Sequence, residues 1–580
     1  MKIKHLFGLA VIAAMTASCS SNEDLGTSGP STGTNEAGVG YATFTINLPS
    51  VSGTRAVGDP TYDQGTAKEY DVNDVTLLIF KKAGSSEGDY TFVEKADLGT
   101  MAPWKDENNS NGITASSTIT AKLNNVALTS EGSTSDYYAL AILNNKNAAD
   151  ENKITLPTST TATYSGWNEA SNADETKFKD NTKGFYMANA PVFVAGGEPT
   201  TLVNINRVYA TKQKAETNAA TTIHVERGLA KVSIHSNTFP STITPSGTKY
   251  TGDKVDITAW KLDVTNKSTF PIHKTAGLTT NFSTIWSNTT TTGASVTRFV
   301  DGSNPSFKRV HWGIDPNYST ALDDLSDCQG AFTVLPADAT IDGAANEPQY
   351  CLENTFDIEH MKQGQTTRVV FKATYTPKGL PAGEKTFYKI GNSTDLWSEA
   401  NLIKQIKAKA VEVLGVAETK ITVDLEATAN DIKNNAGTKL LVEDNVKNDG
   451  TAVSPTDIAK INEKLGLKAA GTDPIVGIAT YKSGESYYIA RIKHFGVLTP
   501  WTEGDDTYGT NNDANNTKYL GRYGVLRNNW YELTIGSVSG PGTPDVPTIK
   551  PDVPDDESYR YISVSVKILS WAKRSDTVDL

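Results

Sequence analysis

Short stretches in which apolar and polar residues alternate recur along this chain, and they constrain its fold more than any other feature. The clearest run is near the end of the chain, where Ile562, Val564, Val566 and Ile568 alternate with two serines and a lysine. A period of two places successive side chains on opposite faces, as in a β-strand with one buried face. We therefore expect a mostly β fold.

The predicted strands follow one another with almost no helical spacing between them, which favours antiparallel sandwiches over a parallel α/β sheet. They are expected at residues 41–48, 75–80, 90–93, 119–123, 138–143, 183–188, 192–194, 201–205, 221–234, 257–264, 332–335, 368–375, 475–481, 486–492, 530–535 and 562–568. Two stretches have helical spacing instead, at residues 394–416 with Ser398 as the N-cap and at residues 455–467. These predict a small helical insertion near residues 394–467.

The first nineteen residues have the pattern of an export signal. Lys2 and Lys4 precede a short apolar run at residues 6–15, and small residues then lead directly to Cys19. This order is typical of a bacterial lipobox, in which Cys19 becomes the lipidated first residue, carrying for example palmitate. An ordinary signal peptide with an incidental cysteine is the alternative. One acyl anchor would tether the protein to a membrane without spanning it.

Composition excludes several classes of function. The formal net charge is −12 and no cluster of Lys and Arg is longer than a pair, which argues against a nucleic-acid partner. The sequence has no HExxH motif, no cysteine cluster and no phosphate-binding loop, so we predict no metal, no cofactor and no catalytic residue. Residues 84–88 match GxSxG, but they lie between two predicted strands, so we interpret them as a hairpin loop.

Two further groups of residues have alternative interpretations. Trp312, Trp501 and Trp530 could stack against sugars, although a tryptophan beside strands is more often part of the core. Cys328 and Cys351 form a possible disulfide, because an exported protein meets an oxidising environment. Such a bridge would be structural only.

The first predicted strand ends at a loop that invites proteolysis. Its apolar face carries Ala42, Phe44, Ile46 and Leu48. The loop at residues 50–59 contains Arg55, which is the only Lys or Arg between residues 5 and 67. An isolated Arg among small residues is an open target for an Arg-specific protease. Cleavage between Arg55 and Ala56 would release the anchor and the first strand together; otherwise Arg55 is simply a solvated loop residue.

The last strand follows a segment rich in Pro, Gly and Asp at residues 540–557. Proline lacks the amide donor that a sheet needs, and such compositions stay extended and semi-rigid. The segment therefore predicts a spacer, and the strand at residues 561–580 could reach a groove in another molecule. It could equally fold back as the last strand of its own sheet, and the pattern alone leaves both arrangements open.

Four motifs, taken in order, resemble those of a known family. They are YALAILN at residues 138–144, VERGLAKV at 225–232, YCLENT at 350–355 and GVLRNNWYELTI at 524–535. Their order is similar to that in the Bacteroidales fimbrillins, the subunits of type V pili. The tail after the Pro/Asp-rich segment most resembles the shaft subunit of the minor (short) fimbriae of Porphyromonas.

The resemblance implies two transthyretin-like β-sandwich domains, at residues 56–225 and 226–539, after a signal peptide at 1–19 and a propeptide at 20–55. It also implies a linker at 540–560 and a donor strand at 561–580. In the family, loss of the first strand leaves a groove that the last strand of another subunit fills. The predicted donor residues are Ile562, Val564, Val566 and Ile568, with Trp571 as a further anchor. The arrangement is heterologous, so it builds a filament.

On this interpretation the protein is a non-enzymatic shaft subunit of a surface fimbrium, made as an outer-membrane lipoprotein precursor and supporting adhesion. Its implied partners are further copies of itself, accessory tip and anchor subunits, and an arginine-specific protease. We favour the shaft because the cleavable loop and the donor strand occur together and no separate ligand-binding domain is evident. The alternative is a monomeric surface lipoprotein that binds glycans. It predicts that Arg55 stays uncut and that residues 561–580 pair within their own chain.

Overall fold

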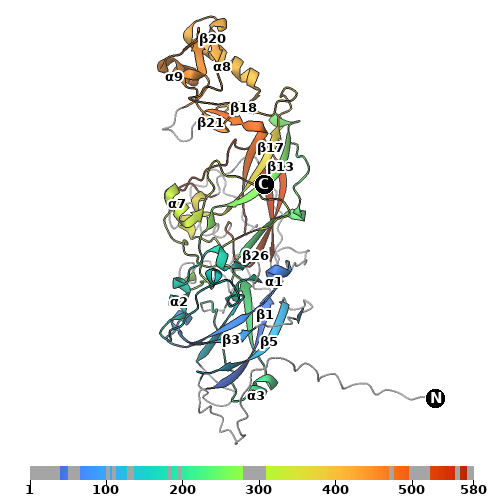
Figure 1. The fold of residues 1–580 in the computed structure, drawn as a ribbon, viewed down its shortest axis with the longest axis vertical. Helices are drawn as coiled ribbons and strands as arrows, with labels where there is room; N and C mark the ends of the chain where they lie inside the picture. Colours follow the sequence, from blue (N-terminus) through green and yellow to red (C-terminus); the bar gives the residue numbers. More distant parts are fainter. Residues whose placement is uncertain are drawn as a thin grey trace, which may run out of the picture.

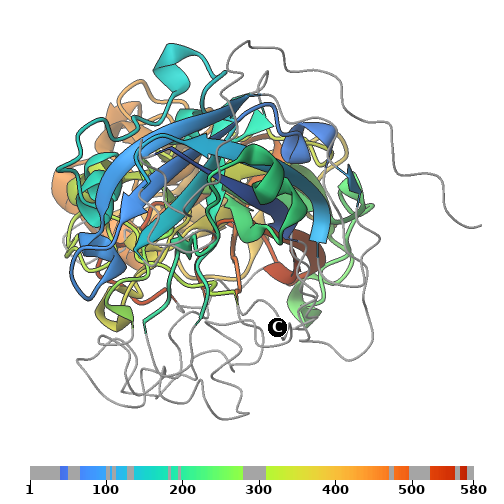
Figure 2. The same ribbon diagram turned by 90° about the horizontal axis from the view of Figure 1, so that it is seen from below.

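The computed structural model describes residues 39–49, 66–99, 105–106, 113–126, 136–180, 184–193, 198–278, 309–468, 476–494, 523–555 and 562–570. These segments build an elongated molecule with an N-terminal sheet at one end, a C-terminal sandwich in the middle and a helical insertion at the other end (Figure 1). Figure 2 looks onto the N-terminal end, with the rest of the chain behind it. The predicted mostly β fold is confirmed. None of the helices in these segments is long and apolar enough to cross a membrane.

The N-terminal sheet has nine strands. They are β1 (Gly40–Pro49), β2 (Val75–Lys81), β3 (Thr91–Gly99), β4 (Lys105–Asp106), β5 (Ile113–Leu123), β6 (Tyr137–Leu143), β9 (Met187–Asn189), β10 (Val203–Asn204) and β11 (Thr221–Arg227). Their order is β3-β2-β6-β9-β11-β1-β5-β4, and β10 also pairs with β6. All neighbours are antiparallel except β1 and β11, which run parallel. A parallel pair needs a long crossover, and the chain between β1 and β11 provides one.

Both faces of this sheet are covered, which explains why β2 reads as a nearly continuous apolar run. Leu77 and Ile79 point into one cluster together with the apolar face of β1. Leu78 and Phe80 point into a second cluster on the opposite face. Short helices accompany the sheet: α1 (Ala67–Tyr70), α2 (Tyr164–Ala170) and α3 (Lys212–Thr217). A small pair, β7 (Lys179–Asp180) and β8 (Gly184–Phe185), lies beside it.

The C-terminal sandwich packs two sheets around one large apolar cluster. The first sheet has the order β16 (Gln349–Cys351), β12 (Ala230–Ile234), β26 (Asn529–Val538) and β27 (Ile562–Ser570). The second has the order β13 (Lys254–Asp263), β17 (Arg368–Thr376) and β25 (Glu485–Arg491). Here β12 and β26 are the parallel pair, a second departure from purely antiparallel sheets. Helix α7 (Leu325–Ala331) and the pair β14 (Thr265–Asn266) and β15 (Phe332–Thr333) flank the sandwich.

The chain passes from one sheet to the other at Gly228. The sequence predicts one strand over residues 221–234, but β11 ends at Arg227 in the N-terminal sheet and β12 begins at Ala230 in the C-terminal sheet. A Cβ atom at Gly228 would lie 2.3 Å from Cδ1 of Phe178, so this close approach requires glycine. The change of sheet therefore falls just after the predicted domain boundary at residue 225.

The helical insertion is present where helical spacing predicts it. Helix α8 (Glu399–Leu414) is N-capped by Ser398, whose hydroxyl accepts from the Asn401 amide, and it ends at Gly415 in the left-handed conformation. Helix α9 (Pro455–Lys464) begins after Ser454. The surrounding strands are β18 (Phe387–Ile390), β19 (Leu396–Trp397), β20 (Ile421–Val423), β21 (Gly437–Lys439), β22 (Val446–Asn448), β23 (Thr451–Ala452) and β24 (Ile478–Tyr481). The insertion encloses an apolar cluster of its own.

Candidate assembly site

The first strand, β1, lies in the interior of the N-terminal sheet and not at its edge. It pairs with β5 along residues 40–49 and with β11 along residues 44–47, so its backbone has a hydrogen-bonded neighbour on each side. Removing a strand from such a position leaves two unpaired sheet edges facing one another. The sheet would then have a slot that accepts one extended strand.

The side chains of β1 form part of the core. Ala42, Phe44 and Ile46 are fully buried, and Leu48 is 2 % exposed. They pack against β2, β6 and β11 in the first N-terminal cluster. On the opposite face, the hydroxyl groups of Thr43 and Thr120 lie 2.8 Å apart, and those of Thr45 and Thr118 lie 2.9 Å apart. These cross-strand pairs align β1 with β5.

The predicted processing residues lie outside the described residues. Cys19 precedes the first described segment, and Arg55 and Ala56 fall between β1 and the next described residue, Thr66. Lipidation at Cys19 and cleavage after Arg55 therefore stay predictions.

The last strand, β27, pairs antiparallel with β26 of the same chain, from Ile562 opposite Val538 to Ser570 opposite Asn529. The sequence analysis favoured a donor strand that reaches another molecule. In this structure of a single chain, the strand instead pairs with β26 of its own chain. The physical reason is that β26 presents an open edge, which an alternating strand nearby can extend. Within the described part of the sheet, β27 is itself an edge strand. Trp571 lies beyond the described residues.

The Pro-rich segment before β27 is not a free spacer, which corrects the sequence interpretation of residues 540–557. Residues 540–555, which we call the strap, run over the surface of the C-terminal sandwich. Val546 and Ile549 are 1 % and 4 % exposed and belong to two small apolar clusters. Proline removes amide donors, but carbonyl groups remain free to accept hydrogen bonds. A segment that cannot join a sheet can therefore still be held in place when side chains elsewhere donate hydrogen bonds to its carbonyl groups.

Three such donors hold strap carbonyls. The Tyr481 hydroxyl donates to the Gly542 carbonyl at 2.7 Å, the Tyr488 hydroxyl donates to the Gly540 carbonyl at 3.1 Å, and the Arg368 guanidinium donates to the Pro547 carbonyl. The strap ends at Asp555, which is 1 % exposed. Its amide donates to the Met361 carbonyl at 3.0 Å, and its carboxylate accepts from the Thr366 hydroxyl at 3.1 Å. Sequence reasoning missed this anchor, although the apolar residues spaced along the Pro-rich segment were a usable signal.

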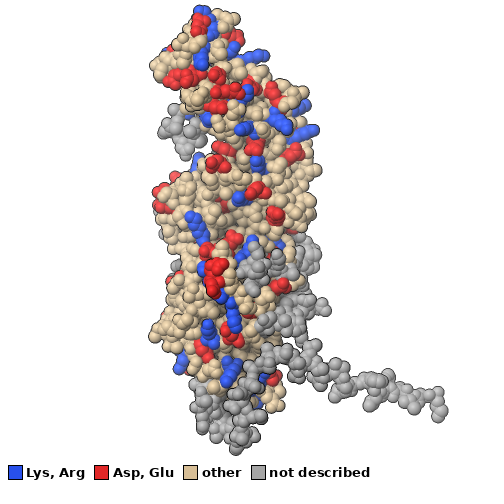
Figure 3. Space-filling view, viewed as in Figure 1, with Lys and Arg blue, Asp and Glu red and all other residues tan. Residues whose placement is uncertain are grey.

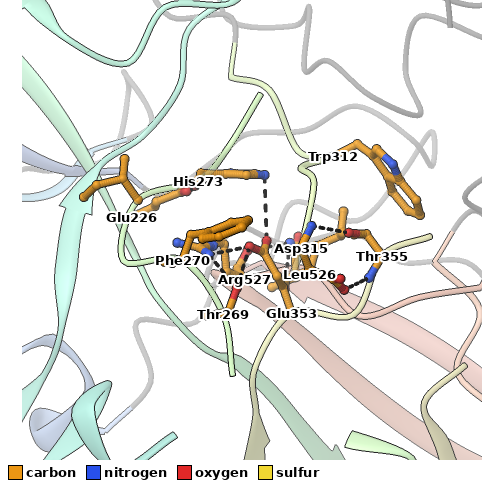
Figure 4. A network of polar contacts seen from close by, with 12 residues as sticks. Glu226, Thr269, Phe270, His273, Trp312, Asp315, Glu353, Thr355, Leu526 and Arg527 are labelled. Atoms are coloured by element: carbon orange, nitrogen blue, oxygen red, sulfur yellow. Dashed lines mark hydrogen bonds and ion pairs between the residues drawn. The ribbon is translucent and has the colours of Figure 1, made fainter. Parts of the chain in front are cut away.

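Three of the four sequence motifs converge where the two domains meet (Figure 4). Glu226, at the end of β11, accepts from Arg309 Nε at 3.0 Å and lies 2.9 Å from His273 Nδ1. Arg527 forms an ion pair with Glu353 and donates to the Phe270 carbonyl at 3.0 Å. All of these side chains are buried.

Opposite charges balance one another in this junction. Burial alone would raise the pKa of Glu226, but Arg309 and His273 outweigh it and hold the pKa of this carboxyl below its ordinary value. Such a buried network is stable only while every partner is present. Glu226, Glu353 and Arg527 come from the recognised motifs, whereas His273 and Arg309 carry no sequence signal.

The possible disulfide between Cys328 and Cys351 is absent, because both thiols are free and buried. Cys328 lies on α7 and packs in a small apolar cluster, whereas Cys351 lies in the main core of the sandwich. Burial raises the pKa of Cys328 to about 11 and raises that of Cys351 further still. Both side chains therefore behave as small apolar residues.

The tryptophans considered for sugar stacking and the loop that matches GxSxG are parts of the fold where the structure describes them. Trp312 is fully buried, with its ring edge-on to Phe356, so it offers no face to a sugar. The ring of Trp530 is covered by the Lys231 ammonium at 3.7 Å, and Trp501 lies outside the described residues. The loop at residues 84–88 precedes β3 and forms a hairpin with β2, as expected.

Acidic and basic side chains are interspersed on the visible face of the molecule (Figure 3). The described residues of this face therefore do not form one large acidic patch, although the net charge of the chain is −12. Mixed surfaces of this kind favour solubility and do not by themselves select a charged partner.

Residues 479–577 match the family model of the C-terminal domain of fimbrillin, a major fimbrial subunit protein of type IV. The match begins in β24, includes β25, β26 and the strap, and extends through β27. No curated protein sequence matches the chain.

Three solved structures are similar over most of this chain. A candidate cell adhesion protein from Parabacteroides distasonis is 11 % identical, with coverage of 92 % of this chain and 98 % of that one and a TM-score of 0.37. The fimbrilin FimA from Porphyromonas gingivalis is 12 % identical, with coverage of 92 % and 99 % and a TM-score of 0.33. The tip fimbrial protein Mfa3 from the same species, truncated at its C-terminus, is 10 % identical, with coverage of 92 % and 100 % and a TM-score of 0.27. What this chain shares with the fimbrillin family model is therefore its C-terminal part, residues 479–577.

Proposed function

We propose that the protein is a structural subunit of a surface pilus and that it polymerises head to tail by donor-strand exchange. In this mechanism, proteolysis releases β1, and β27 of another copy takes its place in the N-terminal sheet. The observation that carries the proposal is the position of β1, which lies between β5 and β11 with its apolar face fully buried. A strand that leaves such a position must be replaced.

The sequence of β27 suits the vacated position. β1 has apolar residues at 42, 44, 46 and 48, and β27 has them at 562, 564, 566 and 568, so both alternate with the same period over similar lengths. Burying four such side chains stabilises by ~1.5–3 kcal/mol each, which gives roughly 6–12 kcal/mol as an upper estimate. A donor strand with this pattern could therefore compensate for most of the core that β1 supplies.

Pairing of β27 with β26 in the single chain is then the resting arrangement of the precursor. At the sheet edge, β27 has one hydrogen-bonded neighbour, β26. In the position of β1 it would have two, β5 and β11, and its apolar face would be enclosed. The exchange therefore gains one backbone ladder, which favours transfer over the resting pairing.

The strap limits how far the donor can travel. Seven residue steps separate Asp555, the last described residue of the strap, from Ile562, where β27 begins. At 3.3–3.6 Å per residue, the tether spans at most about 25 Å. If the strap stays in place, the groove of the next subunit lies within this distance of Asp555, and adjacent subunits are held close together.

The processing steps follow from the same proposal. The precursor is exported, lipidated at Cys19 and displayed on the outer membrane, and an arginine-specific protease then cleaves between Arg55 and Ala56. The products assemble into the shaft of a fimbrium, with accessory tip and anchor subunits at its two ends. The role is mechanical and adhesive and requires no catalytic residue.

The test uses the soluble precursor, residues 20–580, treated with an Arg-specific protease and run unheated on a denaturing gel. We expect a ladder of high-mass bands and a new N-terminus at Ala56. An Arg55→Gln variant and a chain ending at Glu557 should both stay monomeric, because the first keeps β1 and the second lacks the donor. Cleavage at Arg55 without any ladder from the full chain would reject strand exchange.

One observation favours the second candidate, glycan binding by a monomeric surface protein. A cavity of about 1080 Å³ lies beside the N-terminal sheet, lined by Glu87, Tyr90, Tyr138 and His224 among others. The rings of Tyr90 and Tyr138 lie 4.7 Å apart between centroids. Aromatic rings beside polar groups suit sugar rings. Glycan-array binding by the uncleaved chain, lost in Tyr90→Ala, would support this function in place of polymerisation.

A further inference from the structure

A buried glutamate stands at the start of the chain that would remain after cleavage. Helix α1 is a single turn that follows residues 50–65, and its Glu69 is only 1 % exposed. The Glu69 carboxylate lies 2.7 Å from Lys231 Nζ and accepts from the Tyr350 hydroxyl at 2.5 Å and from the Thr66 amide at 2.5 Å. A glutamate on a one-turn surface helix is ordinarily solvated, so this burial needs an explanation.

The partners of Glu69 come from both domains. Lys231 lies on β12 and Tyr350 on β16, both in the C-terminal sandwich, whereas Arg227 ends β11 of the N-terminal sheet. Arg227 Nε donates to the Glu69 carbonyl at 2.7 Å, and its amide donates to Asn528 Oδ1 at 3.1 Å. We call Glu69, Arg227, Lys231 and Tyr350 the junction clamp. Three of its four members belong to the sequence motifs, and the strand-exchange mechanism gives them no role.

The clamp depends on a complete set of charges. Lys231 is 4 % exposed and stands over the Trp530 ring at 3.7 Å, so its ammonium has little contact with water. Burial alone would raise the pKa of Glu69, but Lys231 and the hydrogen bonds from Lys231 and Tyr350 lower it overall. Removing one partner of such a pair leaves a buried charge without compensation, which is strongly destabilising.

The segment that follows α1 shows what the clamp protects. Val72 and Val75 belong to the same apolar cluster as Phe44 and Ile46 of β1, and β2 begins at Val75. When β1 leaves, this cluster loses the apolar side chains that cover one of its sides. Without a fixed point, loss of order would spread from the cut end of the chain into β2, because a new chain end frays until it meets an anchored residue.

We propose that Glu69 is the positioning residue that fixes the start of the mature chain: the junction clamp holds residues 66–70 on the domain junction, so that release of β1 opens its groove while β2 stays ordered. This inference rests on the proposed function, because it assigns the clamp a task only after β1 has been removed. The inference also explains why the VERGLAKV motif at residues 225–232 carries Arg227 and Lys231, which face Glu69 and not solvent.

The experiment compares amide hydrogen exchange at residues 66–81 in the full chain, before and after cleavage with the Arg-specific protease. Glu69→Gln removes the charge and keeps the shape. Before cleavage we expect a smaller change than after it, since β1 still covers the cluster. After cleavage we expect exchange in this segment to rise at least tenfold in Glu69→Gln relative to the wild type. Tyr350→Phe, a milder variant that keeps the ion pair, should give a smaller increase.

The matched control is Glu94→Gln. Glu94 is also buried and accepts from the Asn124 and Asn125 amides, but it lies on β3, away from the clamp. Because Glu94 lies opposite Ile79 of β2, this variant is compared at residues 66–74, where it should leave exchange unchanged. Equal protection of the segment in cleaved Glu69→Gln and cleaved wild type would overturn the inference.

Polymer formation is recorded in the same samples, which separates the two claims. If the cleaved wild type forms no polymer but the segment loses protection only in Glu69→Gln, the clamp stands and strand exchange fails. If polymer forms and the segment is equally protected in both chains, strand exchange stands and the clamp fails.

Discussion

Truncation of Phe44 to alanine gives a sharp test of the role of β1, because its effect should disappear on maturation. Phe44 is fully buried in the first N-terminal cluster. A Phe→Ala change in a packed core costs about 3–5 kcal/mol, through lost burial and the cavity left behind. For a domain of this size, about 2–4 °C of Tm per kcal/mol predicts a fall of about 6–20 °C in the thermal unfolding of the N-terminal domain.

The assay is differential scanning calorimetry of the precursor before and after cleavage. Before cleavage, Phe44→Ala should unfold at the lower temperature. After cleavage and removal of the propeptide, the variant and the wild type should be identical, because residue 44 leaves with the propeptide. The variant should also polymerise faster once cut, since its resident strand is held more weakly than β27 would be.

The matched control is Thr45→Ala on the opposite face of the same strand. Its hydroxyl pairs with Thr118 at an exposed position, so the loss should stay below about 1 kcal/mol. Two results would refute the reasoning. One is an unchanged Tm in the Phe44→Ala precursor, and the other is a difference from wild type that persists after cleavage and removal of the propeptide.

Three further predictions concern the strap, the junction and pH. Asp555→Ala, which loses the hydrogen bond from Thr366, should raise hydrogen exchange at residues 551–555 and leave β17 unaffected; unchanged protection would show that the strap is held elsewhere. Glu353→Gln should cost about 3–5 kcal/mol, measured by urea unfolding, because the buried charge of Arg527 loses the carboxylate that it is paired with. A change below about 1 kcal/mol would contradict the balanced network. Burial lowers the pKa of His224 to about 4, against about 6.5 in the unfolded chain, so the stability it contributes is complete above pH 6.5 and is lost as the pH falls toward 4. That loss should be on the order of 1–3 kcal/mol between pH 7 and pH 4, measured by urea unfolding, and it should be smaller in His224→Gln. Equal pH dependence in both chains would contradict this role of His224.

Much of the local structure could be predicted from the sequence. Alternation located β1, β13 and β26, because a strand with one buried face must repeat every two residues. Apolar, aromatic and β-branched runs located β2, β6, β17 and β25. Helical spacing and Ser398 predicted α8 and its first residue, because an N-cap hydroxyl satisfies an amide that the helix leaves unpaired. One error in strand assignment was the single strand predicted at residues 221–234, where the close approach of Phe178 to Gly228 decides the break and no local pattern records it.

The sequence by itself therefore determined which segments are extended, which face of each strand is apolar, and that the tail resembles β1. Only the tertiary structure decided that β1 lies between β5 and β11, that the strap packs down as far as Asp555, and that Glu69 meets Lys231 across the domain junction. The physical reason is that alternation specifies burial but not the neighbour that provides it. Strand partners, buried ion pairs and free thiols depend on residues hundreds of positions apart, and these meet only when the whole chain has packed.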